Sequence, residues 1–149
     1  MPNLGKKTGE RHMNKQLFLK TLQLWILFTP LAIINGSIRN YVYQPVLGDL
    51  AAHQLSTVLA VILFICVAYI FLGSTTKHAT NTSLFLAGFG LLLITILFEF
   101  VFGHYVVGHP WSRLLADYNV QQGRVWSLFL ITLFFTPFIV KQLKIHRSQ

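Results

Sequence analysis

The stretch that decides the fold is LFLAGFGLLLITILFEFVFGHYVV, residues 84–107, in which apolar and aromatic side chains surround one carboxylate, Glu99. The hydrocarbon core of a bilayer is about 30 Å thick, and a helix needs about 20 mainly apolar residues to cross it. Residues 84–107 meet that length, so they predict a transmembrane helix. Three other apolar runs predict further spans at 17–38, 50–72 and 125–140.

The composition supports a membrane protein, since 54% of the 149 residues are hydrophobic and only 11% are charged. Four spans and their connections use up the chain, so we predict one integral membrane domain over 1–149. The predicted fold class is all-α, a four-helix transmembrane bundle. The net charge of +8 lies largely in the tails, where Lys and Arg meet anionic lipid headgroups. We expect the lipid bilayer as partner and no nucleic acid, because no folded basic module is visible.

Positive charges divide the chain into two sides. The segments before the first run, between the second and third, and after the fourth, together with the first turn of the first run, contain Lys6, Lys7, Arg11, Lys15, Lys20, Lys77, Lys141, Lys144 and Arg147. Because Lys and Arg are concentrated on the cytoplasmic side of a membrane, we predict cytoplasmic tails at 1–16 and 141–149. The size of the chain and its basic tails favour a bacterial inner membrane.

The opposite side of the predicted bundle has charges of both signs. They are Arg39, Asp49, Glu99, Arg113, Asp117 and Arg124. We predict Asp49 as the N-cap of the second helix. An ionised Glu inside a span costs about 2.5 kcal/mol or more unless it is paired or wetted. We therefore predict an ion pair between Glu99 and Arg39, with Arg124 as the second choice, because arginine can bind a carboxylate through two parallel hydrogen bonds.

This polar cluster at the outer membrane face has more than one interpretation. It could pin the helices together, or it could line a pocket of a small-molecule binder or accessory subunit. The candidate ligand-binding residues are Asn35, Arg39, His53, Glu99, His104, Asp117 and Arg124. Alternatively, His53 and His104 could ligate haem or a metal ion in a redox carrier, since both lie near outer helix ends. No cofactor is favoured, and without a serine elbow or catalytic constellation we expect no enzyme.

The spacing of small and polar residues in the third run predicts how that helix packs. In the third run, Gly88, Leu92, Thr95, Glu99 and Gly103 fall on one helical stripe. Small and polar residues on one stripe are typical of helix packing in lipid, and they would also suit a homo-oligomer or a partner in a membrane complex.

A second amphipathic pattern lies between the third and fourth runs. Trp111, Leu114, Leu115 and Tyr118 share one face of a helix predicted over 110–119. This segment is too short to cross the bilayer. We predict a short amphipathic interfacial helix on the outer leaflet, which could cover the polar cluster as a lid.

Overall fold

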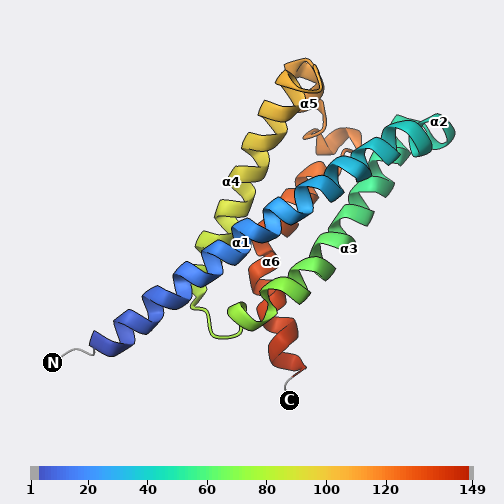
Figure 1. Ribbon diagram of the computed structural model, residues 1–149. Helices are drawn as coiled ribbons and strands as arrows, with labels where there is room; N and C mark the ends of the chain where they lie inside the picture. The colour runs from blue at the N-terminus through green and yellow to red at the C-terminus, as the bar shows by residue number, and fades with distance from the viewer. Residues whose placement is uncertain (1–3, 148–149) are drawn as a thin grey trace.

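The computed structural model describes residues 4–147, and every regular element within that range is a helix (Figure 1). The elements are α1 (Leu4–Ile38), η1 (Arg39–Tyr43), α2 (Gln44–Leu47), α3 (Asp49–Thr76), α4 (Asn81–Tyr105), α5 (Trp111–Ala116), η2 (Val120–Gln122) and α6 (Trp126–His146). Four helical segments of the described chain are long and apolar enough to cross a membrane: Asn14–Leu47, Asp49–Thr76, Asn81–Tyr105 and Trp126–His146. The predicted all-α class with four long apolar helices is confirmed.

The first helix is longer than its apolar run. The cytoplasmic tail predicted over 1–16 is helical from Leu4 onward, because α1 already begins there; residues 1–3 lie outside the described range. Lys, Arg, Glu, Gln and Met in this segment are good helix formers, and they extend a helix that the apolar run has already nucleated. For the same reason α6 continues past 140 to His146.

The connection between the first two long helices is also helical. The π-helix η1 leads directly into α2, and Pro45 lies in the first turn of α2. Proline has no N–H to donate to the preceding turn, and a wider π turn just before it accommodates that loss. The chain reverses at Gly48, whose φ of 78° favours glycine. Gly48 is therefore the N-cap of α3, and the predicted N-cap role of Asp49 is wrong.

The four long helices pack unevenly. Helices α3 and α4 both pack along α6, and α1 packs mainly against α3. Phe28, Phe64 and Phe129 join α1, α3 and α6 in the core, with ring centroids 4.7 to 6.4 Å apart. Helices α1 and α4 lie together where Leu17 packs beside Leu84, and they diverge toward α5 (Figure 1).

The small-residue stripe of α4 lies against neighbouring helices, as its spacing predicts. A Cβ placed on Gly88 would lie 2.0 Å from the backbone oxygen of Phe134 in α6. Further along, the Thr95 hydroxyl accepts a hydrogen bond from Trp25 Nε1 of α1 at 3.1 Å. The stripe thus sets how closely α4 approaches both helices.

We expect Gly88→Ala to destabilise the protein by about 1–3 kcal/mol, because the added methyl meets a backbone carbonyl that cannot rotate away. Gly90→Ala is the matched control, since a Cβ at Gly90 meets nothing within 4 Å. The control should be neutral or stabilising by about 0.5–1 kcal/mol through helix propensity. Thermal unfolding in detergent measures both, and equal effects would contradict the close α4–α6 contact.

Candidate functional site

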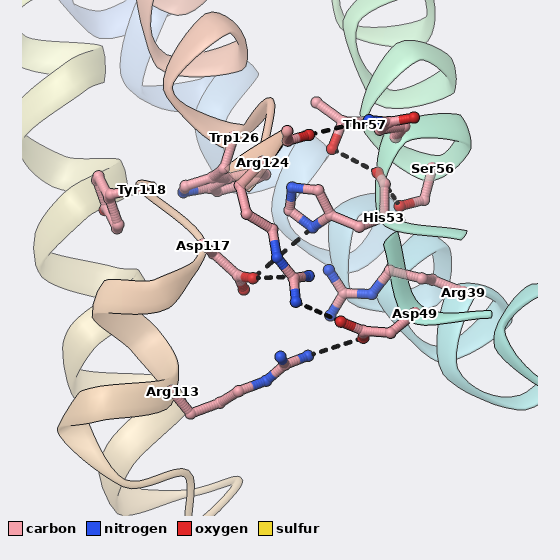
Figure 2. Close-up of polar contacts among 12 residues, drawn as sticks. Arg39, Asp49, His53, Ser56, Thr57, Arg113, Asp117, Tyr118, Arg124 and Trp126 are labelled. Atoms are coloured by element: carbon pink, nitrogen blue, oxygen red, sulfur yellow. Dashed lines mark hydrogen bonds and ion pairs between the residues drawn. The ribbon is translucent and has the colours of Figure 1, made fainter. Parts of the chain in front are cut away.

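An ion-pair network joins the N-terminal end of α3 to the segment between α4 and α6 (Figure 2). The Asp49 carboxylate pairs with Arg113 at 3.2 Å and with Arg124. Arg124 also lies 3.4 Å from Asp117 Oδ1. The side chains of Arg124 and Asp117 are only 13% and 15% exposed, so this part of the network is largely withdrawn from solvent. Arg124 bridges two carboxylates and therefore holds the network together.

His53 lies fully buried beside this network, with 1% of its surface exposed. Its Nδ1 atom is 3.8 Å from Asp117 Oδ1, which is an ion-pair distance when the imidazole is protonated. Neither ring nitrogen has a hydrogen-bond partner in the described part of the chain. The nearby hydroxyls of Ser56 and Thr57 donate to the His53 backbone oxygen, at 3.0 and 2.8 Å, and not to the imidazole ring. His53 and Asp117, both predicted as members of the cluster, are thus brought together.

Glu99 has different partners from those predicted. Its Oε2 atom accepts hydrogen bonds from the Tyr118 hydroxyl at 2.6 Å and from Trp126 Nε1 at 2.7 Å. The predicted ion pair with Arg39, or else Arg124, is wrong: Arg124 pairs with Asp49 and Asp117, and no carboxylate oxygen of the described side chains lies within 4.0 Å of Arg39. Burial and the adjacent Glu99 carboxylate raise the pKa of Tyr118, so the phenol keeps its proton and remains a donor.

Arg39 approaches the network from η1 and has no ion-pair partner among the described side chains. Its Nε atom donates to Asn40 Oδ1 at 3.1 Å. No carboxylate oxygen of the described side chains lies within 4.0 Å of it. Figure 2 shows the side chain extending toward Asp49 and His53. One turn earlier, Asn35 donates to the backbone oxygen of Ser56 at 3.0 Å and ties α1 to α3.

His104 does not join the cluster. Its Nδ1 atom donates to the backbone oxygen of His109 at 2.9 Å, and its ring stacks on Trp111 with centroids 4.0 Å apart. His53 and His104 therefore have separate partners, and neither lines the cavity described below. The described part of the chain contains no group of three or more His, Cys, Asp and Glu residues placed to hold a metal ion. Within the described residues, the contacts of His53 and His104 do not bring the two rings to a shared ligand position.

A cavity of about 370 Å³ lies between α1, α3, α4 and α6, next to the network. Its polar end includes Asn35, Arg39, Glu99, Arg113 and Asp117. Its apolar end includes Trp25, Phe28, Phe64, Phe98, Phe129 and Leu133. The volume falls in the range of about 300–1,000 Å³ that is usual for small-molecule sites, which combine an apolar lining with a few polar groups.

Helix α5 covers one end of this cavity but is shorter than the helix predicted over 110–119. It comprises only Trp111–Ala116. Leu114 is 5% exposed and packs on Gly103 of α4, where a Cβ would meet its Cδ2 atom at 2.7 Å. Trp111 and Leu115 are exposed. The apolar residues predicted to share one face therefore point in different directions: Leu114 packs against α4, whereas Trp111 and Leu115 are exposed.

Sequence reasoning missed some members of the site. Asp49 was counted among the outer charges but not among the candidate ligand-binding residues, although it binds two arginines. Trp126 was not recognised as a partner of Glu99. A buried indole N–H needs a hydrogen-bond acceptor, so a tryptophan predicted at the same membrane depth as Glu99 could have been recognised as its donor. Comparison with protein-family models, curated proteins and solved structures gave no match.

Proposed function

We propose that this chain is an integral membrane protein whose four long helices span the bilayer, with both termini in the cytoplasm and α5 at the outer face. The length and hydropathy of the four helices support spanning. The distribution of lysines supports the orientation, and the small size with basic tails favours a bacterial inner membrane. Trp111 and Leu115, exposed on α5, suit the interfacial region where aromatic side chains are enriched.

Thiol labelling on intact cells tests this topology. In a Cys66→Ala background, Ser112→Cys on α5 should react with a membrane-impermeant maleimide, because Ser112 is exposed and faces outward. His78→Cys, exposed between α3 and α4, should react only after the cells are broken. The reverse pattern would overturn the orientation, and reaction of both residues in intact cells would argue against membrane spanning.

For the function, we propose a non-enzymatic binder of a small molecule at the outer polar cluster, either acting alone or as an accessory subunit. The observation that carries this proposal is the cavity of about 370 Å³, which joins a charged end to an aromatic end. The buried charges beside it engage one another instead of presenting a nucleophile and a base to the cavity. That arrangement supports recognition of a ligand better than a reaction.

Native mass spectrometry of the detergent-solubilised protein tests the proposal. We expect single-chain amphiphiles, with stearate and monostearoylglycerol as probes, to bind with a stoichiometry of one. Ala32→Phe should weaken binding about tenfold or more, because Ala32 lines the cavity and the added ring takes the space of the ligand.

The matched control is Ala51→Phe, because Ala51 is exposed on α3 and does not line the cavity. This variant should bind as the unaltered protein does. Failure of every amphiphile to bind, or equal binding by the two variants, would contradict a ligand site in this cavity.

A further inference from the structure

The polar end of the cavity contains a cation, Arg39, that forms no ion pair within 4.0 Å with a described side chain. Arg113 and Arg124 are both paired with carboxylates, whereas Arg39 makes only the hydrogen bond to Asn40 among the described side chains. Arg39 lines the cavity and is half-buried. A partly buried guanidinium favours an anion, because its attraction is less screened there than in water.

The carboxylates at the same end are already engaged. Glu99 accepts hydrogen bonds from Tyr118 and Trp126, and Asp117 lies beside Arg124 and His53. Arg39, with one hydrogen bond and no ion pair within 4.0 Å, is therefore the charged side chain of the cavity that has the fewest partners among the described residues.

The apolar end of the cavity indicates what the uncharged part of the ligand is. Phe28, Phe64 and Phe129 form its wall from three helices. The hydrogen bond between Trp25 and Thr95 crosses from α1 to α4 alongside them. A volume of about 370 Å³ is near the lower end of the usual range for ligand sites. It suits a single hydrocarbon chain better than a complete two-chain lipid.

The cavity also has an approach from the side. Between the Trp25–Thr95 bond and α5, no hydrogen bond links α1 to α4 within the described range. The two helices diverge there (Figure 1). Ile33 of α1 and Val107 after α4 line the cavity and are also exposed, at 40% and 51%. These exposed lining residues place an opening of the cavity between the diverging helices, and a chain that enters there does not cross the ion-pair network.

We propose that the cavity binds an amphiphile with an anionic headgroup, which Arg39 holds, while one hydrocarbon chain lies between α1 and α4 against the phenylalanines. This inference rests on the proposed function and names the ligand class. The headgroup is a carboxylate or a phosphate, since both accept charge-assisted hydrogen bonds from a guanidinium.

Affinities from native mass spectrometry test the inference with four probes: stearate, stearoyl lysophosphatidic acid, monostearoylglycerol and inorganic phosphate. We expect at least one of the two anionic amphiphiles to bind about tenfold or more tightly than the neutral ester. Whether the carboxylate or the phosphate binds more tightly identifies the headgroup. Arg39→Gln should abolish the preference for the anion without weakening binding of the neutral ester, and Arg39→Lys should retain part of it.

Arg147→Gln is the matched control, because it removes one positive charge near the C-terminal end of α6, where Arg147 is exposed. It should leave the preference unchanged. Equal affinity for anionic and neutral probes in the unaltered protein would overturn the inference and leave the proposed function standing. Inorganic phosphate binding as tightly as the amphiphiles would overturn the role of the chain. A protein that binds no amphiphile, including one whose gap is closed in a dimer, would overturn both.

Discussion

Replacing Arg124 by glutamine is expected to destabilise the protein by about 3–5 kcal/mol, because it leaves buried negative charge without a partner. Arg124 is 13% exposed and lies between Asp49 and Asp117. Asp117 is itself 15% exposed, so water cannot replace the lost guanidinium effectively. Thermal unfolding in detergent should show a large fall in the midpoint temperature.

Two controls separate this effect from a general loss of positive charge. Arg113→Gln removes a cation from the same Asp49 carboxylate, but that pair is 33% and 39% exposed, and such pairs contribute about 1 kcal/mol or less. Adding Asp117→Asn to Arg124→Gln should restore part of the stability, since it removes one unpaired charge. Equal losses from Arg113→Gln and Arg124→Gln would contradict the central place of Arg124.

Replacing Glu99 by leucine is expected to cost about 2–4 kcal/mol, because it leaves the Tyr118 hydroxyl and the Trp126 indole N–H without their acceptor. Both groups donate to Glu99 Oε2, at 2.6 and 2.7 Å. Glu99→Gln is the discriminating variant. Its amide oxygen can still accept from both donors, so its cost should be small.

The unfolding midpoints of the two Glu99 variants decide which kind of partner Glu99 has. A hydrogen-bond acceptor role predicts a large loss for leucine and a small one for glutamine. An ion pair with arginine, which the sequence suggested, predicts a large loss for both, because each would leave the arginine unpaired. Tyr118→Phe in the Glu99→Leu background should recover part of the loss by removing one unsatisfied donor.

The four long helices were predictable because hydropathy is a local property. Each apolar run is long enough on its own to indicate a helix, whatever it packs against. The ends of the helices were not predictable from the same signal. Helix α1 begins at Leu4 and α6 ends at His146, both beyond the apolar runs, where helix propensity determines how far a helix extends. At Gly48 the chain turns through a positive φ, which hydropathy does not indicate.

The candidate site was predictable as a location but not as a set of contacts. The separation of charges along the chain placed Arg124, Asp117 and His53 at one end, and the structure brings these three together. The partner of Glu99 depends on the rotation of α4 and on the path of the chain after α5. One sequence shows neither, so Arg39 seemed the nearest cation, while the neutral donors at the same depth were overlooked.

Whether His53 and His104 face each other was not predictable, for a similar reason. His53 and His104 were grouped because both lie near outer helix ends, but position along a helix does not specify which way a side chain points. His53 is directed toward Asp117, and His104 stacks on Trp111. Helix rotation decides whether two histidines face each other, and one sequence does not show that rotation.

The most direct test of the central claim is the fluorescence of a Trp111→Phe protein titrated in detergent with dibromostearate. The remaining tryptophans, Trp25 and Trp126, both line the cavity, and bromine quenches only indoles that it approaches closely. A ligand chain in the cavity predicts saturable quenching at one equivalent, lost on adding Ala32→Phe and kept on adding Ala51→Phe. Quenching that rises linearly with the quencher and is the same in both variants would mean that the chain only coats the surface, and it would contradict a ligand site between α1 and α4.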